Sequence, residues 1–185
     1  ETWLVTSVTN VQTRLVPWLD RDIVSVTANQ VERITIGDGE GAYVLARANA
    51  ESEFTIDGAP EGRVLDQEKV RPVNRALADV ELEDVKQRSE FPLPDDAKVA
   101  EVLTFDGLSV RVRLANIDKK NWATFEASYV GDTADTSDAA KAAREAAETI
   151  NARVGNWVYW LPSNPFLNLT RPVEEVLTPE TPDAS

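Results

Sequence analysis

The feature that most constrains the fold is the run from Leu108 to Leu114, in which apolar side chains occupy every second position. Successive side chains of a strand point to opposite faces, so this pattern is typical of a strand with one buried face. The Asp106-Gly107 pair just before it is a hairpin-turn signal, and an apolar run from Val99 to Phe105 comes before that turn. The centre of the chain is therefore predicted to be antiparallel sheet.

Weaker strand signals lie on both sides of this hairpin. They are short, rich in β-branched or aromatic residues and bounded by turn residues such as the glycine-rich stretch 37–41. The predicted strands are Val31–Ile36, Tyr43–Arg47, Glu53–Ile56, Glu81–Lys86, Asn121–Tyr129 and Trp157–Leu161. The core residues that we expect from all these patterns are Ile34, Ile36, Val44, Leu77, Val110, Val112, Leu114, Ile150 and Val154.

Helical spacing of apolar residues occurs in two longer segments. The segment from Ser137 to Val154 carries a stripe of small residues, with Ser137 or Asp138 as N-cap and Gly155 just after its end. A second helix is predicted near residues 70–80, with Pro72 in its first turn because an interior proline costs about 3 kcal/mol. A short final helix is expected near Thr170.

This order of elements occurs twice, so the predicted fold class is α+β with two repeated β-β-β-α-β units. Each unit is expected to be a mainly antiparallel sheet with a helix packed on one face. The predicted boundaries are 1–30 for an N-terminal strand and connecting segment, 31–90 for the first unit, 91–97 for a linker, 98–177 for the second unit plus the short C-terminal helix, and 178–185 for a loose tail.

Composition removes several classes of function. The chain has no His and no Cys, which excludes Ser-His-Asp and Cys-His catalysis and zinc sites built from imidazole or thiolate. Its formal net charge is −13 and its basic residues are scattered, which argues against nucleic acid as a partner. No run of about 18 apolar residues is present. The chain contains no Met, so we expect it to be a piece of a longer protein.

One loop gathers the oxygen ligands that hard cations prefer. Asp132, Asp135 and Asp138 lie in it among several hydroxyl side chains. The loop lacks the glycine and the distal glutamate of an EF-hand, and an acidic loop before a helix is more often a solvated cap. We therefore expect no metal site and no cofactor, with these three aspartates as the only residues considered as ligands.

The strand from Trp157 to Leu161 is apolar on both faces, which is explained either by burial on both sides or by contact with a partner protein. Trp160 points away from Trp157 and Tyr159, and the segment containing Phe166 follows closely. We expect this segment to cover Trp160. If it does not, Trp160 and Phe166 form an exposed patch and become the partner-binding candidates.

Several stretches taken in order resemble the bacterial domain-of-unknown-function family 4340. They are Glu1–Val5, Trp18–Ile23, Val31–Ile36, Val73–Leu77, Leu82–Val85, Thr104–Leu108, Ile150–Val154 and Trp157–Pro162. The resemblance implies an extracytoplasmic, periplasmic protein with an upstream membrane anchor and repeated β-rich units, and this chain matches its C-terminal half. Genes of this family often lie next to genes of ABC-type transporter components. The family has no established activity, so the resemblance assigns no catalytic residues.

Three functions remain in competition. The first is a non-enzymatic extracytoplasmic module of a membrane-anchored envelope protein that binds a partner protein, with an ABC-type transporter component as the candidate. The second is a carboxylate-based hydrolase, and the third is a small-ligand or metal-binding receptor domain. A pocket with two close, desolvated carboxylates would favour the hydrolase, whereas exposed aromatic surface would favour the interaction module.

Overall fold

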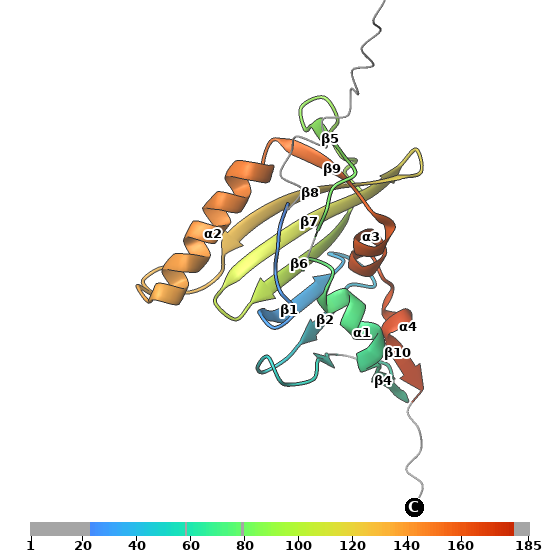
Figure 1. Ribbon diagram of the computed structural model, residues 1–185. Helices are drawn as coiled ribbons and strands as arrows, with labels where there is room; N and C mark the ends of the chain where they lie inside the picture. The colour runs from blue at the N-terminus through green and yellow to red at the C-terminus, as the bar shows by residue number, and fades with distance from the viewer. Residues whose placement is uncertain (1–22, 58, 79, 180–185) are drawn as a thin grey trace, which may run out of the picture.

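The computed structural model describes residues 23–57, 59–78 and 80–179, and it shows a mixed α+β fold built on one large antiparallel sheet (Figure 1). The sheet has eight strands in the order β3-β2-β1-β6-β7-β8-β9-β5, and a small separate sheet pairs β10 with β4. The strands are β1 (Val31–Ile36), β2 (Tyr43–Ala46), β3 (Thr55–Ile56), β4 (Arg63–Leu65), β5 (Asp84–Gln87), β6 (Lys98–Thr104), β7 (Leu108–Ile117), β8 (Lys120–Tyr129), β9 (Trp157–Leu161) and β10 (Leu177–Pro179).

The register of the large sheet separates an apolar inner face from a polar outer face. Residues directly opposite each other on antiparallel strands share a face. Ile34, Val102, Val110 and Ala127 form one such row across β1, β6, β7 and β8, and all four are buried. In the neighbouring row, Arg111 lies between Glu101 and Glu126. The central strands thus have one face in the core and one face toward water, as their alternating sequence pattern predicted.

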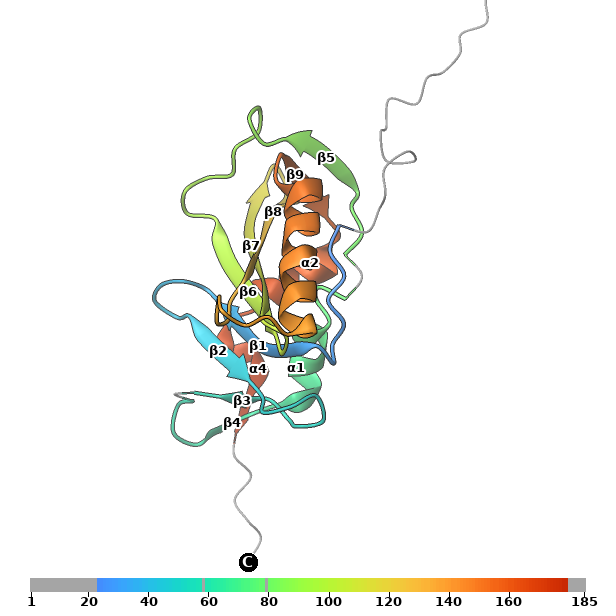
Figure 2. The same cartoon turned by 90° about the vertical axis from the view of Figure 1, so that its left-hand side faces the viewer.

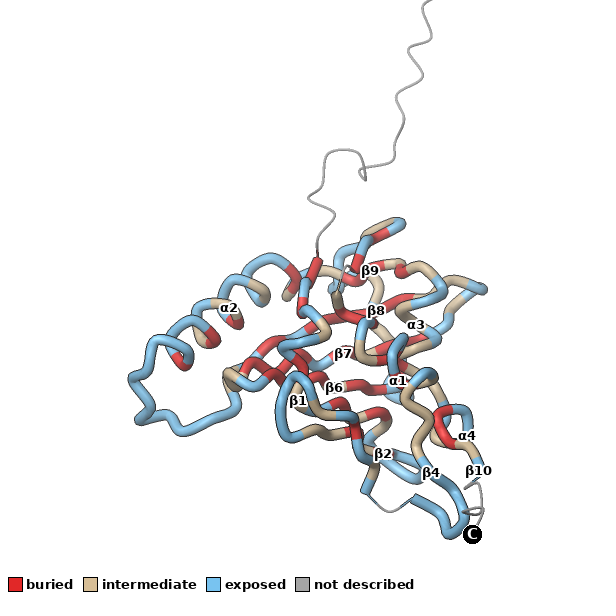
Figure 3. Tube along the Cα trace, turned by 60° about the horizontal axis from the view of Figure 1, so that its bottom comes forward, coloured by how far each residue is buried: buried red, intermediate tan, exposed pale blue. Residues whose placement is uncertain are grey.

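Four helices contribute to the core on the inner face. They are α1 (Gln67–Asn74), α2 (Asp138–Val154), α3 (Ser163–Leu169) and α4 (Val173–Val176). Each supplies at least one buried apolar side chain to the same hydrophobic cluster as the inner face of the sheet. Figure 2 shows α2 in front of the central strands, and Figure 3 shows the buried strand segments between α2 and α1. None of the described helices is long and apolar enough to cross a membrane.

Burial confirms the predicted register of β7. Val110 and Val112 are fully buried, whereas Arg111 is exposed. Ser109 is also buried, because its hydroxyl donates a hydrogen bond to Glu101 at 2.7 Å on the outer face. The prediction for β2 was wrong by one residue: Tyr43 and Leu45 are buried and Val44 is only partly so, because β2 pairs with β1 in a register that puts Leu45 opposite Ile34.

The two predicted units do not form two sheets. Strand β1 pairs with β6, and β5, which was expected to close the first unit, pairs with β9 at the far edge. Pairing β1 with β6 removes the two strand edges that separate units would have left open to solvent. The coarse α+β prediction is confirmed, but the structure does not confirm the repeated β-β-β-α-β units.

Helix α1 begins earlier and is shorter than predicted. The Asp66 side chain accepts hydrogen bonds from the main-chain N–H groups of Glu68 and Lys69, which fixes the start at Gln67. Pro72 therefore lies in the second turn rather than the first, and the helix ends two residues later. The spacing of Leu77 predicted its burial correctly, although it follows the helix in a turn.

Helix α2 agrees closely with its prediction. Ser137 is the N-cap, and its hydroxyl accepts a hydrogen bond from the N–H of Ala140 at 3.2 Å. Ala140, Ala143, Ala147 and Val154 are buried, whereas Ile150 is only partly buried. The small residues of this stripe allow the helix to lie close to β8 and β7.

The expected linker, and the first two residues of the expected loose tail, make specific contacts. Within residues 91–97, the Phe91 ring packs 4.8 Å from the Trp122 ring, and the main-chain oxygen of Pro94 accepts a hydrogen bond from Arg113 at 3.1 Å. Thr178 and Pro179 belong to β10 and pair with β4. Residues 1–22, which include the predicted N-terminal strand, and residues 180–185 of the predicted tail lie outside the described residues.

Candidate functional site

The aspartates considered as metal ligands lie in the exposed loop between β8 and α2 and at the first residue of α2. Two of them accept hydrogen bonds from main-chain N–H groups of the loop. Asp132 accepts a hydrogen bond from the N–H of Ala134, and Asp135 accepts one from the N–H of Ser137, both at 2.8 Å. Asp138 instead lies 3.8 Å from Lys141 on the first turn of α2. Among residues 23–57, 59–78 and 80–179, no group of three or more acidic side chains could hold a metal ion.

Arg144 of α2 fixes the shape of this loop. Its guanidinium donates hydrogen bonds to the main-chain oxygens of Asp135 at 2.9 Å and Asp132 at 3.1 Å, and it stacks 4.4 Å from the centre of the Tyr129 ring. The hydrogen bonds from the N–H and hydroxyl of Ser137 hold the pKa of Asp135 below its ordinary value. Asp135 therefore stays ionised at neutral pH, which does not suit a general acid.

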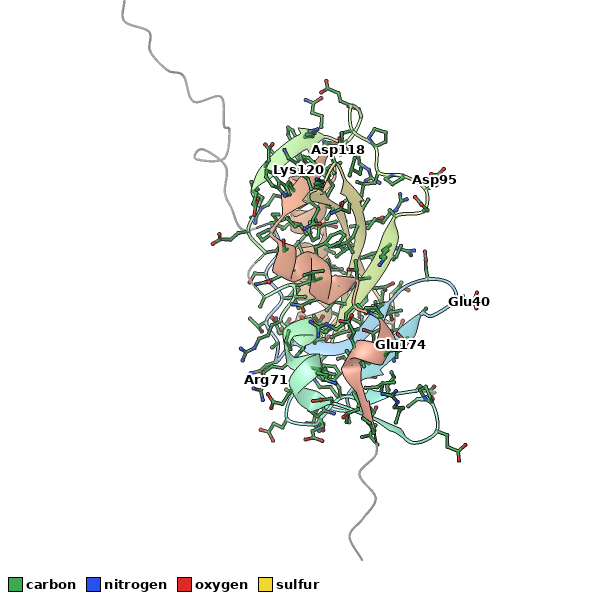
Figure 4. The ribbon with its side chains drawn as sticks, turned by 90° about the vertical axis from the view of Figure 1, so that its right-hand side faces the viewer. Glu40, Arg71, Asp95, Asp118, Lys120 and Glu174 are labelled. Atoms are coloured by element: carbon green, nitrogen blue, oxygen red, sulfur yellow. The ribbon has the colours of Figure 1, made fainter. Side chains whose placement is uncertain are left out.

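The structure does not bring the two partner-binding candidates together. Trp160 lies opposite Trp122 on the outer face, is partly exposed, and carries the Lys120 ammonium 4.3 Å above its ring. Lys120 lies beside Asp118 at the β7–β8 turn (Figure 4). Phe166, in α3, packs instead against the main core on the inner face. Phe166 therefore does not cover Trp160 as expected, and the alternative, an exposed Trp160–Phe166 patch, does not form on the described surface either.

A groove that the sequence analysis missed lies at the opposite end of the sheet from Trp160, between the β6–β7 hairpin and the loop that follows β8. Both segments are at the left of Figure 1. The cavity is about 300 Å³, and Phe105 and Val130 line it. These two side chains are 40% and 52% exposed, although large apolar residues of the described chain are mostly buried. We call this cavity the hairpin groove.

The geometry of the hairpin groove follows from one glycine. Gly107 has φ +88°, which allows the tight turn between β6 and β7, and a Cβ there would lie 2.8 Å from the Tyr129 ring. The close approach lets the main-chain oxygen of Gly107 accept a hydrogen bond from Val130 at 2.7 Å. This bond joins the hairpin to the loop after β8, and Phe105 and Val130 of these two segments line the same groove.

Four acidic residues line the groove together with these apolar side chains. Glu32, Asp106, Asp132 and Asp135 line the groove, and none of its described lining residues is Lys or Arg. The Asp106-Gly107 turn signal located the hairpin correctly, but it carries no information about the loop that packs beside it. The groove forms from segments about 25 residues apart, which only the fold brings together.

A second cavity, of about 380 Å³, lies between the β1–β2 turn, residues 95–99 and residues 169–172. It mixes acidic Asp38, Glu40, Asp95 and Asp96 with basic Lys98 and Arg171. The main-chain oxygen of Arg171 accepts a hydrogen bond from Tyr43 at 3.0 Å. The mixture of charges defines no ligand of one sign, so this cavity gives less support to a binding function than the hairpin groove.

Among the stretches that carry the resemblance, Thr104–Leu108 contributes to the hairpin groove, whereas two asparagines of other stretches lie within the fold. Asn151 bonds to β8, and Asn74 is the last residue of α1 with its Oδ1 buried without a hydrogen-bond partner. Trp18, Asp20 and Asp22 lie outside the described residues. The chain has no significant match among protein-family models, curated proteins or solved structures.

Proposed function

We propose that this chain is a non-enzymatic interaction module that binds a partner protein through the hairpin groove. The observation that carries the proposal is that two exposed large apolar side chains, Phe105 and Val130, line one groove together with four acidic residues. Interfaces concentrate their binding energy in such apolar centres, and the polar rim excludes water from them.

The family resemblance supports the cellular setting of the proposal. It favours an extracytoplasmic, periplasmic module of a membrane-anchored bacterial envelope protein, with an ABC-type transporter component as the candidate partner. It also favours an origin of the chain in two β-β-β-α-β units. In support, each half has a run of strands followed by a helix and one further strand, although the first half has an additional short strand, β4, before α1.

The test is co-purification of the partner from membranes of cells that make the tagged full-length protein, after crosslinking. Replacing both groove residues, Phe105→Ser and Val130→Ser, should remove the crosslinked partner. The matched control replaces the equally exposed apolar residues Val64 and Leu167, which are 39% and 58% exposed, by serine and should retain it.

Both double variants remove apolar surface that is already in contact with water, so neither should change the unfolding midpoint by much. The proposal is overturned if the groove variant and the control retain the same partner to the same extent, or if wild-type protein yields no specific crosslink.

A further inference from the structure

We infer that the hairpin groove takes a basic segment of its partner, in which lysine or arginine side chains flank an apolar side chain that sits between Phe105 and Val130. The inference rests on the proposed function and adds the chemistry of the partner. It depends on three features of the groove. Apolar side chains form its floor, the charged residues of its rim are all acidic, and two nearby arginines donate their hydrogen bonds to main-chain oxygens.

The apolar floor gives a partner side chain a place to leave water. Phe105 and Val130 protrude from two adjacent turns, and the main-chain hydrogen bond between Val130 and Gly107 holds those turns together. A cavity of about 300 Å³ is at the lower end of the range for small-molecule pockets and accommodates a few side chains. An aliphatic side chain is therefore a better occupant than a large ligand.

The rim decides the charge of the occupant. Glu32, Asp106, Asp132 and Asp135 place four carboxylates around one small cavity, in a chain whose net charge is already −13. Like charges in this arrangement repel one another and attract cations, so a basic segment relieves the repulsion whereas an acidic segment increases it. Asp135 contributes fully, because its hydrogen bonds to Ser137 keep it ionised.

Two arginines that contact lining residues of the groove direct their guanidinium groups to main-chain oxygens. Arg144 directs its guanidinium to main-chain oxygens of the loop and to the Tyr129 ring. Arg47 donates to the main-chain oxygens of Val31 and Ala50 and has Phe105 5.7 Å from its guanidinium carbon. Their hydrogen bonds go to main-chain oxygens rather than to the rim carboxylates, although the charge of Arg144 also acts on Asp135.

The test measures binding of a short fluorescent peptide, with one leucine flanked on both sides by lysines, to the full chain by fluorescence anisotropy. Four substitutions neutralise the rim: Glu32→Gln, Asp106→Asn, Asp132→Asn and Asp135→Asn. Asparagine keeps the oxygen that accepts the hydrogen bonds within the loop, so the fold should be retained while the charge is lost. A matched control neutralises four exposed carboxylates elsewhere: Glu40→Gln, Glu61→Gln, Glu174→Gln and Glu175→Gln. Glu40 and Glu174 project from the surface in Figure 4.

We expect the rim variant to bind the peptide about tenfold more weakly, and the control to bind within about twofold of wild type. Replacing the leucine of the peptide by serine should weaken binding to wild type by about tenfold as well, because the floor then has no apolar occupant. Val130→Ser should give the same loss with the rim intact.

Equal weakening in the rim variant and the control would overturn the inference, because attraction to the whole acidic surface would then explain binding. Equal binding of the leucine and serine peptides would overturn it too, since the floor would contribute nothing. The two proposals fail separately: if the partner crosslinks through the groove but the lysine-leucine peptide does not bind, only the partner chemistry is wrong. If peptide binding follows the expected pattern but no partner is found in membranes, the proposed function is wrong.

Discussion

Asn151 of α2 bonds both polar main-chain groups of Ala127 in β8. Its Oδ1 accepts a hydrogen bond from the Ala127 N–H at 2.8 Å, and its Nδ2 donates one to the Ala127 oxygen at 2.7 Å. Strand β9 pairs with β8 only at Asn121, Trp122 and Ala123, so it leaves the rest of that edge without a strand. The carboxamide takes the place of a neighbouring peptide group and attaches the helix to the sheet.

Replacing Asn151 by alanine should therefore lower the free energy of unfolding by about 1–3 kcal/mol, the cost of leaving partly buried polar groups without partners. Asn151→Asp should also destabilise, since a carboxylate accepts from the N–H but faces the carbonyl oxygen without a donor. Urea unfolding followed by tryptophan fluorescence measures both changes. Glu148→Ala, at an exposed position of the same helix, is the control and should stay within about 0.5 kcal/mol. Equal loss in the control would show that the bonds to Ala127 contribute nothing.

The two tryptophans that face each other on β8 and β9 should differ in their contribution to stability. Trp122 is 2% exposed and packs against Phe91, so Trp122→Ala should cost about 3–5 kcal/mol. Trp160 is only partly buried beneath Lys120, so Trp160→Ala should cost about 1–2 kcal/mol. Equilibrium unfolding of the two variants gives the comparison. A larger loss at Trp160 would mean that its ring is covered more completely than the outer face indicates.

Local signals in the sequence predicted most of the individual elements. The alternation around Val110 gave the faces of β7, and the cap at Ser137 gave the start of α2, because both depend on residues a few positions apart. The pairing of β5 with β9 and of β1 with β6 was missed, because strand order depends on which distant edges meet. The hairpin groove was missed for the same reason. No local pattern relates Phe105 to Val130, and only the fold brings their turns together at Gly107.

Two tyrosines should make stability fall at high pH. Burial raises the pKa of Tyr43 and of Tyr159 to about 12 from the ordinary value of 10. Below pH 10 both hydroxyls are protonated in the folded and the unfolded chain, so they add no pH dependence. Between pH 10 and 12 the unfolded chain loses these protons first, so stability decreases as the pH rises. Denaturant midpoints across this range should fall in wild type and fall less in a variant with Tyr43→Phe and Tyr159→Phe. An identical decrease in both proteins would exclude these tyrosines as its cause.

The edge strand β5 has one of its main-chain N–H groups bonded by its own side chain. Glu83 donates its N–H to the Trp160 oxygen and Arg88 donates its N–H to the Asn156 oxygen, so both ends of β5 are tied to β9. Between these two bonds, the Val85 N–H donates to the Asp84 carboxylate at 2.9 Å. The Gln87 oxygen accepts hydrogen bonds from Glu90 and Phe91.

This blocked edge should keep the chain from pairing with other strands, because an unpaired row of N–H and C=O groups is a template for association. Asp84→Ala removes the acceptor for the Val85 N–H and leaves that group free to bond to another strand, so we expect concentration-dependent self-association with little change in the unfolding midpoint. Sedimentation velocity over a range of protein concentrations measures it. Asp84→Asn is the matched control, since its carboxamide oxygen still accepts the hydrogen bond and should preserve the behaviour of wild type. The prediction is wrong if Asp84→Ala sediments like the control at every concentration. In that case the shortness of β5 and the turn after Gln87 protect the edge. The Asp84–Val85 hydrogen bond then affects only the local conformation of the strand.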